Sequence, residues 1–78
     1  MHRLPAVTGN QVVRVLRRAG FAVVQQRGSH VQMRSVDAGG NRVTFPVPVH
    51  AGRTVKRGTL KGILRKAGLT AEDLRKLL

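Results

Sequence analysis

The apolar residues of this chain change their spacing twice, and this change limits the folds that the sequence can adopt. They recur at helical spacing over residues 9–19 and again after residue 59. Between these stretches, residues 21–26 are rich in β-branched and aromatic side chains, and residues 30–35 and 42–47 alternate as strands do. We therefore expect an α+β fold of order α-β-β-β-α, a small two-layer domain with two helices on one face of a three-stranded antiparallel sheet.

Capping residues mark where the helices begin. Thr8 and Gln11 have the spacing of a capping box, which predicts a first helix over residues 9–19. Thr59 is a plausible cap for the second helix. Thr70 and Asp73 repeat the capping pattern and predict a short final helix.

Turn residues separate the expected strands. Arg27-Gly28-Ser29 ends the first strand, and a Gly-rich turn around Gly39 joins the second to the third. Pro46 and Pro48 are expected to end the last strand ladder, because neither has an N–H to donate.

The length and the absence of cysteine fit one small intracellular domain. A chain of 78 residues buries only about 60% of the surface that its unfolded form exposes, so residues 1–78 are expected to form a single domain. Without cysteine there is no disulfide framework. No apolar run is long enough to cross a membrane, and the N-terminus lacks the pattern of a signal peptide. These features predict a cytoplasmic protein without a membrane partner.

The charge balance predicts a polyanionic partner. Fifteen Lys and Arg residues against three acidic residues give a formal net charge of +12. The acids, Asp37, Glu72 and Asp73, are too few and too scattered for a catalytic Mg²⁺ cluster, so we expect no metal and no other cofactor. Phe21 and Phe45 are the only aromatic residues, which disfavours a stacking platform for single-stranded bases.

Histidine is the natural proton-transfer group for metal-free RNA cleavage, which needs a base for the ribose 2′-hydroxyl and a donor for the leaving 5′-oxygen. His2 lies in the terminal segment and is expected to be irrelevant. His30 begins a strand and projects to the side opposite Val31 and Met33, which disfavours a core role. The meander would bring His30 and His50 to the same end of the sheet. The two imidazoles would then divide acid and base roles, or His50 would contact RNA or hydrogen-bond the loop; we favour the accessory role.

Basic residues follow the third strand and form a candidate track for the phosphate backbone. Lys61 and Arg65 are four residues apart on one helix face, while Lys56 and Arg57 lie near the start of that helix, whose dipole favours phosphate. A helix surface that serves only solubility normally mixes acidic with basic residues, whereas residues 40–71 contain no acidic residue. Backbone N–H groups at Gly28 and Ser29 are further candidate phosphate contacts, although a simple hairpin turn explains this pair equally well.

Together these motifs resemble the HicA toxin family, also called the YcfA-like family. The resemblance rests on Gly-Ser-His at residues 28–30, the Gly-rich turn, and FPVPVHAGRTVKRGTLKGILRKAGLT at residues 45–70. It implies a double-stranded-RNA-binding-domain-like fold and a small mRNA interferase of a type II toxin-antitoxin system, neutralised by a HicB-like antitoxin. The catalytic histidine of the family falls on His30. No catalytic role is carried over to His50.

Two other functions remain open at this point. The domain would bind duplex RNA by shape without cutting it, or its charge would serve only an acidic protein partner.

Overall fold

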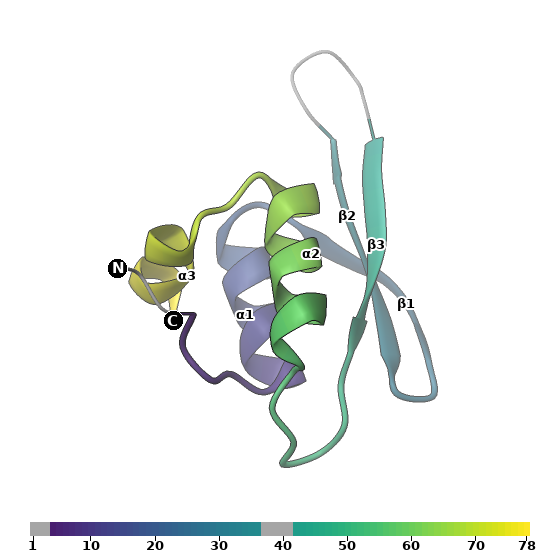
Figure 1. The fold of residues 1–78 in the computed structure, drawn as a ribbon. Helices are drawn as coiled ribbons and strands as arrows, with labels where there is room; N and C mark the ends of the chain where they lie inside the picture. The colour runs from purple at the N-terminus through teal and green to yellow at the C-terminus, as the bar shows by residue number, and fades with distance from the viewer. Residues whose placement is uncertain (1–3, 37–41) are drawn as a thin grey trace.

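The computed structural model describes residues 4–36 and 42–78 and confirms the expected α-β-β-β-α order (Figure 1). The elements are α1 (Gly9–Arg18), β1 (Ala22–Arg27), β2 (His30–Val36), β3 (Arg42–Pro48), α2 (Arg57–Ala67) and α3 (Ala71–Leu77). His2, Asp37 and the expected turn at Gly39 lie outside the described residues. In the part of the chain that the structure describes, no helix is long and apolar enough to span a membrane.

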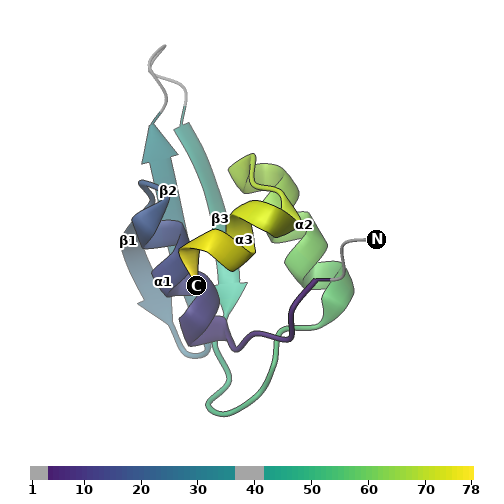
Figure 2. The same ribbon diagram turned by 90° about the vertical axis from the view of Figure 1, so that its left-hand side faces the viewer.

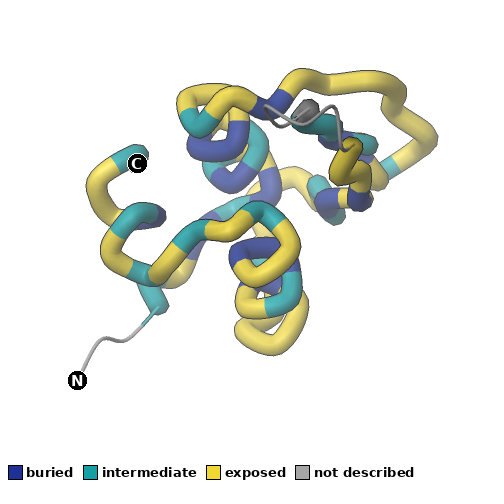
Figure 3. Tube along the Cα trace, turned by 90° about the horizontal axis from the view of Figure 1, so that it is seen from above, coloured by how far each residue is buried: buried dark blue, intermediate teal, exposed yellow. Residues whose placement is uncertain are grey.

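The molecule has the two expected layers. The sheet is antiparallel with the order β1-β2-β3, and α1 and α2 cover one of its faces, while no described helix covers the other, which we call the bare face. The third helix, α3, packs on the side of the helices away from the sheet (Figures 1 and 2). The helices turn their buried sides inward (Figure 3). The core consists of Val7, Val12, Val15, Leu16, Phe21, Val31, Met33, Phe45, Val47, Leu60, Ile63, Leu64 and Leu74.

Two of the three predicted caps are present. The Thr8 N–H donates to Gln11 Oε1 at 2.8 Å, and the Gln11 N–H donates to Thr8 Oγ1 at 3.2 Å. At α3 the Thr70 N–H donates to Asp73 Oδ2 at 2.9 Å, and the Asp73 N–H donates to Thr70 Oγ1 at 3.1 Å. These reciprocal bonds satisfy backbone donors that the first turn of a helix leaves unpaired.

The predicted cap at Thr59 is wrong, because the N-cap of α2 is Lys56, three residues earlier, and the helix begins at Arg57. The physical reason lies in the preceding segment. The Val55 N–H donates to the Val7 carbonyl at 2.8 Å, which holds the chain extended up to Val55. The first helical bond then runs from the Leu60 N–H to the Lys56 carbonyl at 2.8 Å. Thr59 therefore lies inside the first turn, and Lys56 makes no side-chain cap.

The expectation that Pro46 and Pro48 end the strand ladder is wrong for Pro46, which lies inside β3, whereas β3 does end at Pro48; both prolines pair with β2. The Val49 N–H donates to the Ser29 carbonyl at 2.6 Å, so the odd-numbered residues of this strand carry the bonds to β2. The even-numbered residues direct their backbone toward the free edge, where a missing N–H costs no ladder bond. Edge position makes these prolines compatible with the sheet.

Candidate active site

His30 lies at the start of β2 on the bare face of the sheet. A tight turn at Gly28 and Ser29 precedes it, and Gly28 adopts the left-handed conformation with φ of 54°. Arg27 pairs with His30 across this turn. Because Val31 points into the core, the adjacent His30 projects outward, as predicted, and it is exposed.

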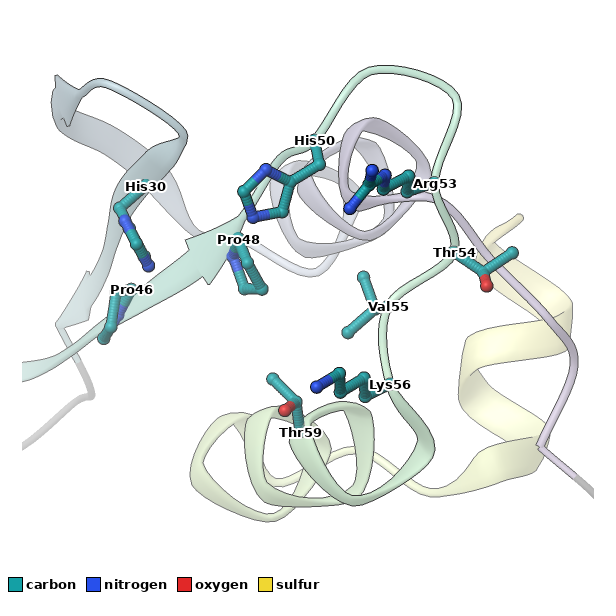
Figure 4. Close-up of a pocket in the computed structure, with 9 residues that line it drawn as sticks. All are labelled: His30, Pro46, Pro48, His50, Arg53, Thr54, Val55, Lys56 and Thr59. Carbon is teal, nitrogen blue, oxygen red and sulfur yellow. The ribbon is translucent and has the colours of Figure 1, made fainter.

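His30 and His50 line the same pocket, of about 500 Å³, at one end of the sheet (Figure 4). The register explains this proximity, because His30 pairs with Pro48 and the chain reaches His50 two residues later. The pocket lies between the end of β3 and the start of α2. Its lining residues are His30, Pro46, Pro48, His50, Arg53, Thr54, Val55, Lys56 and Thr59.

The pocket combines an apolar floor with a cationic rim. In Figure 4 the Pro48 ring lies below His50, and Lys56 and Thr59 lie across the pocket, on the segment before α2 and on α2 itself. The Arg53 N–H donates to the His50 carbonyl at 3.0 Å, and this bond turns the chain back over the pocket. Two imidazoles, a guanidinium and an ammonium group thus surround one cavity whose lining contains no carboxylate.

The two imidazoles of the pocket have no structural task in the described part of the chain. Within residues 4–36 and 42–78, neither His30 nor His50 has a side-chain hydrogen bond, and neither is buried. The described carboxylates belong to α3, where Asp73 forms the cap and Glu72 lies 3.7 Å from Lys76 Nζ. The rim is therefore free to bind an anionic group.

The four basic residues of the predicted phosphate track, Lys56, Arg57, Lys61 and Arg65, do not all line the histidine pocket. Lys61 and Arg65 share a side of α2, as expected, but they border a separate depression of about 300 Å³ with Leu4 and Leu69. Arg57 borders a third depression, at the N-terminal segment, which shares Thr54, Val55 and Lys56 with the histidine pocket. Of the four basic residues predicted to bind RNA, only Lys56 lines the histidine pocket.

Arg53 and Thr59 are among the pocket residues that the sequence did not assign to the site. Arg53 is one of the basic residues that follow the third strand in the sequence, but nothing in the sequence places it beside His50. Thr59 has the pattern of a cap, whereas its side chain lines the pocket. Both residues reach the pocket because the chain turns after β3 and the connecting segment folds back toward α2. A prediction of this turn would have placed them there.

The fold and the pocket define a class: a small α+β domain with a bare sheet face and a cationic, histidine-bearing pocket at one end of the sheet. Residues 9–69 match the family described as HicA toxin of bacterial toxin-antitoxin. The chain therefore belongs to the HicA toxin family of toxin-antitoxin systems, as the sequence motifs indicated, and family membership implies an antitoxin partner. No curated protein matches the chain. The matched segment ends before α3.

Proposed function

We propose that this toxin is a metal-independent endoribonuclease that cleaves mRNA, with His30 as a general acid or base. The observation that carries the proposal is the pocket in which the exposed His30 side chain lies among cationic groups. Histidine suits proton transfer near neutral pH, and a bare sheet face gives a polymer access to it.

The reaction that suits these groups is attack by the ribose 2′-oxygen on the adjacent phosphorus. The O2′–P bond forms as the 2′-hydroxyl proton is removed, and the P–O5′ bond breaks as O5′ receives a proton. The products are a 2′,3′-cyclic phosphate and a 5′-hydroxyl end. The positive charges of Arg53 and Lys56 would stabilise the negative charge that builds on the phosphate oxygens.

The remaining predicted RNA contacts extend the interface beyond the pocket. Gly28 and Ser29 precede His30, so a phosphate beside His30 would lie near their backbone. Arg57, Lys61 and Arg65 would hold more distant phosphates along α2. Such contacts position RNA but carry little sequence information.

The test is cleavage of labelled mRNA by purified protein in the presence of EDTA. We expect the wild type to cut and to leave cyclic phosphate ends, and His30→Ala to lose at least about a hundredfold in rate, the usual contribution of one acid or base. Lys76→Gln, in α3, is the control for a neutral surface change. A folded His30→Ala variant that still cleaves RNA and still arrests growth contradicts the assignment. Intact RNA with a retained gel shift would show a non-catalytic RNA-binding module instead.

For the antitoxin we propose a HicB-like protein that is acidic where it meets the toxin or that covers His30. The uncompensated charge of the pocket supports an acidic contact, since complementary charge favours association. The expected result is loss of RNA binding by the complex. A structure of the complex in which both His30 and the basic residues of α2 stay accessible would contradict the proposal.

A further inference from the structure

We infer that His50 is the second proton-transfer group of the pocket, acting opposite His30 on the same scissile phosphate. This inference rests on the proposed ribonuclease function and names the group that the function leaves unassigned.

The first argument is position. His30 pairs with Pro48, and the bond from the Val49 N–H to the Ser29 carbonyl extends the pairing one residue beyond β3. Both imidazoles line the same cavity of about 500 Å³. A phosphate group in this cavity would have one histidine from each of two chain segments beside it.

The second argument is that the His50 ring has no structural task in the described part of the chain. Its side chain is exposed and makes no hydrogen bond there, whereas its backbone carbonyl forms the turn with Arg53. A histidine that held the loop would use its ring nitrogens for that purpose. Substitution of the ring should therefore leave the fold intact.

The third argument is the chemistry of the other lining residues. Arg53 and Lys56 already supply permanent positive charge, so the pocket does not need His50 as a phosphate anchor. The reaction moves two protons, one from O2′ and one to O5′. The hydroxyls of Thr54 and Thr59 are poor acids, which leaves His50 as the lining residue suited to work with His30.

In this scheme one neutral imidazole accepts the 2′-hydroxyl proton as the O2′–P bond forms. The other imidazole, protonated, donates to O5′ as the P–O5′ bond breaks. The enzyme ends with the two protonation states exchanged, and proton exchange with water restores them. No oxidant, reductant or further reactant is required.

The first experiment compares the steady-state kinetics of His50→Ala and His50→Asn with those of the wild type. Asn retains a polar group but cannot shuttle a proton at neutral pH. We expect both variants to lose about 10²- to 10⁴-fold in kcat with KM changed little. The melting temperature should stay at the wild-type value. An effect on KM alone, or wild-type kcat in His50→Asn, would make His50 an RNA contact and overturn the inference.

A second experiment uses RNA with sulfur in place of the bridging 5′-oxygen at the cleavage site. A thiolate leaves without protonation, so this substrate does not need the general acid. We expect it to restore the rate of one of the two alanine variants, His30→Ala or His50→Ala, but not of the other. Rescue of both or of neither would overturn the division of roles. Absence of cleavage by the wild type would instead refute the proposed function itself.

Discussion

Gly9, the first residue of α1, packs directly against the backbone of Pro48. A Cβ atom at Gly9 would overlap the Pro48 carbonyl oxygen and would lie 2.7 Å from the Val49 Cα. The same backbone pairs with His30 and leads to His50. The start of α1 and the shape of the histidine pocket are therefore coupled through this contact.

Gly9→Ala should destabilise the protein and impair the pocket. Overpacking of this kind costs about 1–3 kcal/mol, because backbone atoms have to move. Gly62→Ala is the matched control, since its Cβ would meet no atom within 4 Å and the same change inside a helix gains about 0.8–1.0 kcal/mol. Urea unfolding measures both, and RNA cleavage should fall only in Gly9→Ala. Equal stabilisation by the two changes would show that the contact is not tight.

Lys56→Gln should weaken RNA binding in a salt-dependent way. Its ammonium group lies at the rim of the pocket, where it would neutralise one phosphate. Losing that contact should reduce the slope of log affinity against log salt concentration by about 1. Fluorescence titrations from low to moderate salt measure the slope. Lys76→Gln removes the same charge from α3 and should leave it unchanged; an equal effect of both would indicate that only total charge matters.

Leu74→Ala should destabilise the domain although α3 lies outside the segment that matches the family. Leu74 is 0% exposed and completes the core, so its truncation should cost about 2–5 kcal/mol. Leu78→Ala, at a residue 39% exposed, applies the same change at the surface and should cost far less. Thermal and urea unfolding of both variants check this. Similar small losses would mean that α3 contributes little to the core.

The contribution of Asp73 to the stability of α3 should change with pH only at acidic pH. The Thr70 N–H bond to the carboxylate is the main cause that lowers the pKa of Asp73 below its ordinary 3.8, with smaller contributions from the Thr70 side chain and Lys76. A lowered pKa stabilises the folded state above the unfolded pKa, and this stabilisation disappears as pH falls through the folded value. The stability difference between wild type and Asp73→Asn should thus shrink below about pH 3.8. A constant difference down to pH 2, measured by urea unfolding, would contradict this assignment.

Features that depend on neighbouring residues could be predicted from the sequence. The capping boxes at Thr8 and Thr70 need only residues three positions apart, and the structure contains both. The outward projection of His30 follows from strand alternation. The meander then fixes a register that pairs His30 with Pro48, which brings His50 to the same pocket.

Features that depend on distant contacts could not be predicted. The start of α2 is set by the bond from Val55 to Val7, whose partner lies far away in the sequence. The place of Arg53 and Thr59 at the pocket depends on the path of the loop between β3 and α2. The strand β1 forms as expected, but all its residues are exposed.

The prolines of β3 also affect how the sheet meets other chains. An open strand edge with regular N–H groups is a template for intermolecular pairing and hence for aggregation. Pro46 and Pro48 remove donors from one such edge, and the irregular register around Val24 distorts the other. Both edges of the sheet are thus poor templates for the addition of a strand from another molecule. This should limit aggregation of the protein at high concentration.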